Sequence, residues 1–127
     1  MMRNGFSKTH IYMIGAIWLT GFVFAAAFAL APDLNFFTKG MDKIAHMAAF
    51  GFLTLWPALL IKHTRTLLVI VCLLFLLGIA VELVQHYIPR RKPDVMDGIF
   101  NTLGILAGLS LATLMNQLKK TLLPATA

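Results

Sequence analysis

Long apolar stretches constrain this chain more than any other feature of its sequence. Four such segments lie at about residues 11–31, 44–61, 67–84 and 95–114. Each is close to the roughly 20 residues with which an α-helix crosses a hydrocarbon core of about 30 Å. Only helices and closed barrels satisfy their backbone in lipid, and these segments lack the two-residue alternation of barrel strands. The sequence therefore predicts an all-α integral membrane protein, a four-helix bundle with short loops.

The composition agrees with a membrane protein and argues against a soluble domain and a nucleic-acid-binding protein. Hydrophobic residues make up 59% of the 127 residues and charged residues only 13%, whereas a soluble domain needs about a quarter charged residues. The formal net charge of +6 does not indicate nucleic-acid binding, because the basic residues lie in short clusters between apolar segments. The lone Cys72 excludes a disulfide framework. We expect a single transmembrane domain over residues 1–127.

The first apolar segment has two interpretations. A basic start, an apolar stretch and three alanines at 25–27 are features of a cleaved signal peptide. The apolar run continues to Ala31, which is long enough to span a bilayer, and Pro32 directly after it makes a poor cleavage site. We therefore expect a retained helix.

The loop charges predict the orientation. With four spans, both termini and the loop at 62–66 share one side of the membrane. The basic residues divide almost evenly between the two sides, whereas all five acidic residues fall on the side opposite the termini. They are Asp33, Asp42, Glu82, Asp94 and Asp97. The excess positive charge therefore lies with the termini, which predicts cytoplasmic termini.

Polar residues are spaced so that they can meet on the side opposite the termini. Residues 42 and 46 are four apart at the start of the second segment, and residues 82 and 85 are three apart at the end of the third, so each pair shares a helix face. A stripe with steps of three and four follows the fourth segment. It consists of Asp94, Asp97, Asn101, Gly104 and Gly108. Because Gly104-x-x-x-Gly108 permits close approach of another helix, we expect this stripe to face the bundle interior.

Ionisable groups inside the predicted membrane spans indicate a functional site, because each costs several kcal/mol in lipid unless it is paired or hydrated. Candidate ion pairs are Glu82 with Arg90 or Arg91, and Lys43 with Asp94 or Asp97. The candidate catalytic residues are His46, Glu82 and Asp97. The candidate substrate-binding residues are Asp42, Lys43, Gln85, Arg90, Arg91, Asp94 and Asn101.

Structural roles are the alternative for each of these residues. Asp42 and Asp94 can cap helix N-termini, the basic run at 90–92 can bind lipid headgroups, and His46 can be a packing residue. A metal site formed by histidine and carboxylates is a further alternative, but no compact motif such as H-E-x-x-H supports it. We assign no metal ligands, and the cofactor is left unknown.

Several separate motifs, in a fixed order, together resemble the VanZ-like family of bacterial membrane proteins. They are Asp42-Lys43-x-x-His46-x-x-x-Phe50-Gly51, Glu82-x-x-Gln85, Pro89-Arg90-Arg91 and Asp94-x-x-Asp97-x-x-x-Asn101-x-x-Gly104. The resemblance covers residues 42 to about 108. It implies a bacterial inner-membrane protein, in a family named for a member linked to low-level resistance to the glycopeptide teicoplanin.

Three functions remain open at this point. The first is an outer-face site that recognises or modifies a lipid-linked or cell-wall precursor, with Lys43, Arg90 and Arg91 binding an anion and His46 as acid or base. The second is a non-enzymatic envelope scaffold that limits antibiotic access. The third is a small transporter or proton relay. Whether the protein is an enzyme is left undecided. The expected partners are membrane lipids, such a precursor, and a second copy of the chain through a glycine face.

Overall fold

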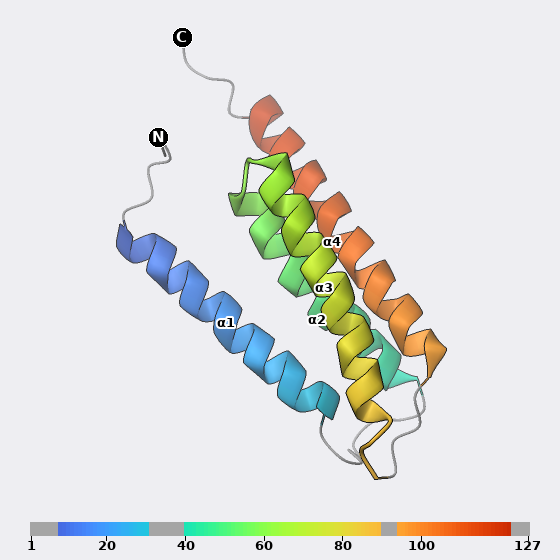
Figure 1. The fold of residues 1–127 in the computed structure, drawn as a ribbon. Coiled ribbons are helices and arrows are strands. Elements are labelled where there is room, and N and C mark those ends of the chain that lie inside the picture. Colours follow the sequence, from blue (N-terminus) through green and yellow to red (C-terminus); the bar gives the residue numbers. More distant parts are fainter. Residues whose placement is uncertain (1–7, 31–39, 90–93, 123–127) are drawn as a thin grey trace.

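The computed structural model describes residues 8–30, 40–89 and 94–122, and within them the chain forms four helices and no strand (Figure 1). The helices run alternately up and down the bundle, so that α1 begins and α4 ends at the same end. They are α1 (Lys8–Leu30), α2 (Met41–Leu60), α3 (Thr64–Gln85) and α4 (Val95–Leu122). The predicted all-α four-helix fold is confirmed.

Length and polarity mark three of the described helices as candidate membrane spans. Helices α2, α3 and α4 are each long and apolar enough to cross a bilayer, and α1 carries a shorter apolar stretch, Tyr12–Ala27. Large apolar side chains such as Leu73 and Leu76 on α3 and Leu106 on α4 are exposed on the outside of the bundle. Such a surface suits hydrocarbon rather than water. Helix α4 continues past the predicted end of its span to Leu122, where Lys119 and Lys120 in the last turn are favourable for the helix dipole.

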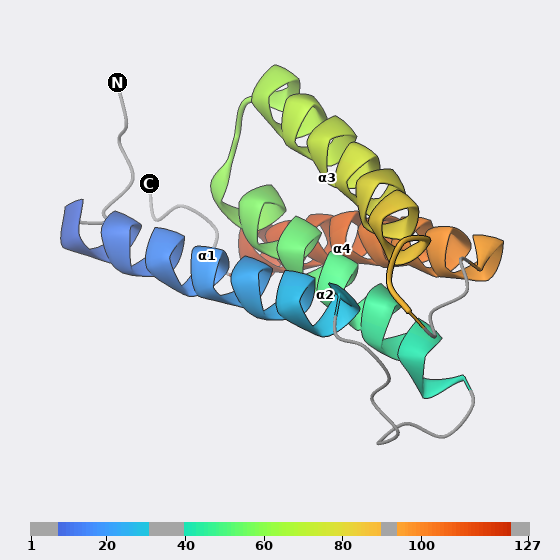
Figure 2. The ribbon, with the colours of Figure 1, turned by 60° about the horizontal axis from the view of Figure 1, so that its bottom comes forward.

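The closest helix contact joins α2 to α4. A side chain at Gly104 would overlap the carbonyl oxygen of Met47, and a Cβ atom at Gly108 would lie 2.6 Å from the carbonyl oxygen of Gly51. The two backbones therefore touch, as small residues permit in membrane helices. The predicted packing role of the glycine stripe is thus observed, with α2 as its partner. Because α3 runs back between them in the chain, α2 and α4 are parallel (Figures 1 and 2).

Helix α1 is attached to α2 by a hydrogen bond that replaces a donor missing from the backbone hydrogen bonds of α2. Pro57 lies inside α2 and has no N–H, so the Leu53 carbonyl lacks its usual donor one turn along. The indole N–H of Trp18 on α1 donates to this carbonyl over 3.0 Å. Trp18 also stacks on Phe22, with ring centroids 5.8 Å apart. In lipid, a neighbouring group must satisfy a carbonyl freed in this way, and α1 supplies the donor.

A small apolar core lies one to two turns deeper in the bundle than His46 and Asn101. Phe50, Leu53, Leu74 and Ile105 are buried together where α2, α3 and α4 meet. Phe50 lies beside Gly78, whose missing side chain leaves room for the ring. In the described part of the chain, α2 and α3 each contact all three other helices, whereas α1 and α4 do not adjoin. The most extensive of these contacts is that of α2 with α4, and it includes the first turns of both helices.

Candidate functional site

Three helix ends meet at the end of the bundle opposite the start of α1. They are the N-termini of α2 and α4 and the C-terminus of α3 (Figures 1 and 2). The parallel contact of α2 and α4 sets the register of the side chains. Lys43 lies opposite Asp97 nearest the helix ends, and His46 lies opposite Asn101, between this ion pair and the level at which Gly104 meets Met47. The glycine contact therefore brings polar residues of two distant segments into bonding distance.

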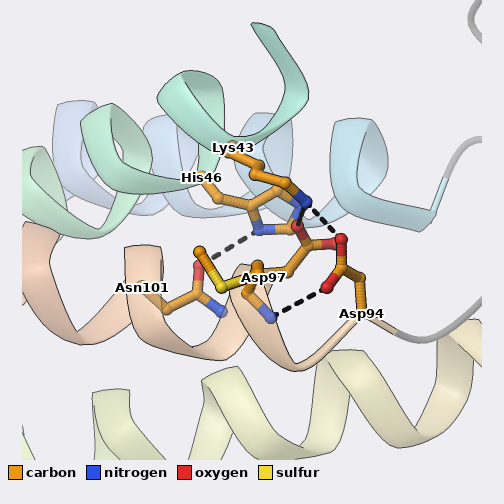
Figure 3. Close-up of polar contacts among 6 residues, drawn as sticks. Lys43, His46, Asp94, Asp97 and Asn101 are labelled. Carbon is orange, nitrogen blue, oxygen red and sulfur yellow. Dashed lines mark hydrogen bonds and ion pairs between the residues drawn. The ribbon is translucent and has the colours of Figure 1, made fainter. Parts of the chain in front are cut away.

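Lys43 is held by two carboxylates from α4 and its N-cap. Its Nζ donates to Asp97 Oδ1 over 3.1 Å and also to Asp94 Oδ2 (Figure 3). The side chain of Asp97 is 7% exposed, that of Lys43 22% and that of Asp94 45%. The sequence left open which aspartate pairs with Lys43, and the structure uses both. The charge of Lys43 is thus matched in the interior by Asp97 and at the rim by Asp94.

Asp94 has a second role as the N-cap of α4. Its Oδ1 accepts a hydrogen bond from the backbone N–H of Met96 over 2.9 Å, which satisfies one of the unpaired donors of the first turn. The hydrogen bond from Lys43 lowers the pKa of the Asp94 carboxyl below its usual value, and the Met96 N–H lowers this pKa further. The capping role that the sequence offered as an alternative is therefore present together with the ion pair.

His46 and Asn101 form the buried part of the cluster. The His46 Nδ1 lies 3.1 Å from Asn101 Oδ1, and both residues are 4% exposed. Because an amide oxygen only accepts, Nδ1 carries the proton in this contact and a neutral ring keeps Nε2 as its acceptor. The imidazole also lines an apolar cavity of about 30 Å³ between α1, α2 and α3. This volume is sufficient for a single water molecule.

Glu82 is not part of the Lys43 ion pair, but its carboxylate accepts a hydrogen bond from the backbone N–H of Asp94 at the start of α4. Its Oε2 would be 3.2 Å from a Cβ atom at Gly98, so the carboxylate lies directly against the α4 backbone. It lines a groove between α3 and α4 that Asn101 also lines. Within the described ranges Glu82 forms no ion pair. Its expected partners, Arg90 and Arg91, lie outside the described residues.

The remaining candidates occupy less informative positions. Gln85 is 1% exposed at the end of α3, and Asp42 is half-buried in the first turn of α2, where the helix dipole favours a carboxylate. The sequence interpretation did not include Gly98. The signal was present, because a glycine next to Asp97 leaves the α4 backbone uncovered by a side chain at this level. Over residues 8–30, 40–89 and 94–122, no three His, Cys, Asp or Glu side chains are grouped so that they could hold a metal ion.

The fold and the cluster define a small polytopic membrane protein with polar and ionic groups concentrated at one end of its bundle. The sequence model of the VanZ/LLP1 family matches residues 3–116, and the chain therefore belongs to the VanZ/LLP1 family. This membership relates the protein to glycopeptide resistance at the level of the family. No curated protein and no solved structure matches the chain.

Proposed function

We propose that this protein lies in the bacterial inner membrane with its termini in the cytoplasm, and that its polar cluster faces outward and binds the phosphate of a lipid-linked envelope precursor. The observation that carries this proposal is a lysine ammonium placed in the first turn of a membrane helix between two carboxylates of unequal exposure. Charges at such positions are costly and mark functional sites by default.

The helix directions favour an anionic ligand. Because α2 and α4 are parallel, both N-termini lie at this end, and each carries the positive end of its helix dipole. Lys43 adds a full positive charge between them. A phosphate that enters the cluster therefore meets two dipole ends and an ammonium group.

The two aspartates have different expected roles in binding. Asp94 is 45% exposed at the rim, so a phosphate can replace it at Lys43 at little cost. Asp97 is 7% exposed and remains as the permanent counter-charge, which holds Lys43 in position when no ligand is bound. Arg90 and Arg91, which adjoin this end in the sequence, would supply bidentate contacts to the same phosphate.

His46 is the residue placed for proton transfer if the bound precursor is modified. Asn101 fixes its ring orientation and tautomer through Nδ1, which leaves Nε2 to accept or return a proton. In a protein that only binds the precursor, the same pair supports the wall of the site. A protein that modifies the precursor and a protein that only binds it must both recognise it, so recognition is the function that we propose.

A binding experiment tests the proposal. The purified protein in lipid nanodiscs is titrated with a fluorescent polyprenyl phosphate, and Lys43→Gln is expected to weaken binding about tenfold or more through loss of a charged hydrogen bond. Lys43→Arg keeps the charge and should retain most of the affinity. Lys119→Gln, at the other end of α4, is the control. Unchanged affinity in a folded Lys43→Gln variant would refute the proposed site.

An envelope scaffold that limits glycopeptide access is the second candidate, because Lys43 is already neutralised within the protein. In a scaffold the cluster only fixes the bundle, so variants that remove a charge should lose folding and teicoplanin resistance together. Variants that fold normally but lose resistance would favour the binding site. Transport is less well supported, since the described acidic residues lie at one end of the helices.

A C-terminal fusion tests the proposed orientation. A fluorescent protein that matures only in the cytoplasm should fluoresce when it is fused after residue 127, whereas alkaline phosphatase at the same position should be inactive. The opposite pair of results would place the cluster on the cytoplasmic side and exclude an extracellular ligand.

A further inference from the structure

A groove runs between α3 and α4 on the side of α4 away from Lys43. Its outer part has a volume of about 400 Å³ and is lined by Glu82, Gly98 and Asn101 among apolar residues. Its inner part has a volume of about 440 Å³ and an almost wholly apolar wall. The two parts share Phe75, Thr102 and Ile105 in their linings, so they adjoin along the helices.

Glycines on both walls make this groove and shape its polar end. Gly98 leaves the α4 surface bare, so that the Glu82 carboxylate lies against it. Gly78 on α3 leaves room for the Asn101 side chain, whose Nδ2 would be 3.3 Å from a Cβ atom at that position. The groove opens beside exposed apolar side chains such as Ile79 and Leu106, and it is therefore accessible from the hydrocarbon region.

The polar end presents one acceptor and one donor. Glu82 forms no ion pair within the part of the chain that the structure describes. Its carboxylate accepts one hydrogen bond, from the backbone N–H of Asp94, and lines the groove with acceptor capacity to spare. Asn101 uses its Oδ1 for His46, so its amide group offers the groove only N–H donors. A ligand that complements this end carries a cationic donor and an acceptor oxygen on the same headgroup.

We propose that the α3–α4 groove binds one hydrocarbon chain of an aminophospholipid, with the primary ammonium of its headgroup at Glu82. The ammonium donates a charge-assisted hydrogen bond to the carboxylate, and an oxygen of the phosphate or ester groups accepts from Asn101. The chain lies along Phe75, Ile105 and Leu109, in the inner part of the groove. An anionic headgroup without an amine is disfavoured, because it would approach Glu82 with like charge.

This inference goes beyond the proposed function and does not depend on it. Lys43 does not line the groove, and the aminophospholipid neither occupies nor neutralises it. The groove is open to the bilayer at the side of the bundle, whereas the Lys43 cluster lies at the helix ends. Asn101 is the residue that the two regions share.

Lipid binding to the purified protein tests the groove. The detergent-solubilised full chain is incubated with dipalmitoyl phosphatidylethanolamine, phosphatidylglycerol or phosphatidylcholine, and bound lipid is quantified by native mass spectrometry. We expect phosphatidylethanolamine to bind about tenfold more tightly than phosphatidylglycerol, as for a hydrogen bond between charged groups. Glu82→Gln keeps the shape of the side chain and should remove this preference.

A second variant tests whether the chain lies in the groove. Thr102→Phe fills the groove where its two parts adjoin and should reduce binding of phosphatidylethanolamine several-fold. Leu83→Phe adds bulk on the exposed surface of α3 outside the groove and should leave binding unchanged.

Three results would overturn the inference. Equal binding of the ethanolamine and glycerol lipids to the wild-type chain would exclude recognition of the amine by Glu82. Equal binding of phosphatidylcholine and phosphatidylethanolamine would show that a hydrogen-bonding ammonium is not required. Equal effects of Thr102→Phe and Leu83→Phe would exclude the groove as the site. Polyprenyl phosphate binding, measured on the same samples, reports on the Lys43 site separately.

Discussion

His46 on α2 and Asn101 on α4 are joined by a buried hydrogen bond between Nδ1 and Oδ1, 3.1 Å long, although 55 positions separate them in the chain. The bond lies one turn above the contact of Lys43 with Asp97 and one turn below the glycine contact of the two helices. It therefore joins the ionic rim of the cluster to the tightest packing in the bundle. Asn101 also faces the α3–α4 groove, so that it contacts both regions for which a ligand is proposed.

Replacement of Asn101 should destabilise the bundle. Asn101→Leu leaves the His46 Nδ1 buried without an acceptor, which costs about 1–3 kcal/mol, and we expect a lower thermal unfolding temperature in detergent. Thr113→Val is the control, because Thr113 is exposed on the same helix and bonds only to the carbonyl of Leu109. If both variants unfold at the wild-type temperature, the His46–Asn101 bond does not contribute to stability.

Side chains at the α2–α4 contact should separate the two helices. Gly108→Ala places a Cβ atom 2.6 Å from the Gly51 carbonyl oxygen, and overpacking of this kind costs about 1–3 kcal/mol. Gly15→Ala on α1 meets no atom within 4 Å and is the matched control. Thermal unfolding of the two variants should differ clearly, with only Gly108→Ala destabilised. A cross-link between cysteines introduced on α2 and α4 should also form less efficiently in Gly108→Ala.

The bond between Trp18 and the Leu53 carbonyl should be coupled to Pro57. Trp18→Phe removes the donor and leaves a carbonyl unpaired in an apolar setting, at a cost of about 1–3 kcal/mol. Pro57→Ala restores a backbone N–H that can satisfy the same carbonyl within α2. The loss caused by Trp18→Phe should therefore be smaller in the Pro57→Ala background. A double-mutant cycle of unfolding free energies measures this coupling, and strictly additive effects would contradict it.

The lowered pKa of Asp94 predicts how acid affects the cluster. Its folded-state pKa lies below the reference value of 3.8, chiefly because Lys43 donates to it. The ionised carboxylate therefore stabilises the fold above pH 3.8, and this contribution is lost as the pH falls through the lower, folded-state pKa. We expect Asp94→Asn to show a weaker loss of thermal stability between pH 5 and pH 3 than the wild type. Parallel pH profiles would exclude this contribution.

The sequence predicted the elements of the fold well because the bilayer fixes their length. Apolar runs near 20 residues gave four helices, and steps of three and four residues placed Asp97, Asn101 and Gly104 on one face. The helix that meets this face was not predictable, since a glycine face is compatible with any neighbour. Helix α3, which adjoins α4 in the chain, contacts it less closely than α2 does.

The candidate site was predicted in composition more than in arrangement. Spacing alone brought Lys43 and Asp97 to the same depth, and the contact between them follows from charge. The separate position of Glu82 could not be predicted, because it depends on how far α3 stands from α4 and on the bare surface at Gly98. The donor for the carbonyl freed by Pro57 could not be predicted from the sequence either, because Trp18 lies 35 positions away from Leu53.

The parallel pairing of α2 and α4 has a consequence for biosynthesis. Two neighbouring helices of the same direction cannot be inserted as a hairpin, since α3 must first carry the chain back across the bilayer. During translation, Lys43 and His46 therefore enter the membrane before Asp97 and Asn101 have been made. Until the ribosome has passed Gly108, the ammonium and imidazole groups of α2 have no native counterpart, and they must be shielded by water, lipid headgroups or the insertion machinery.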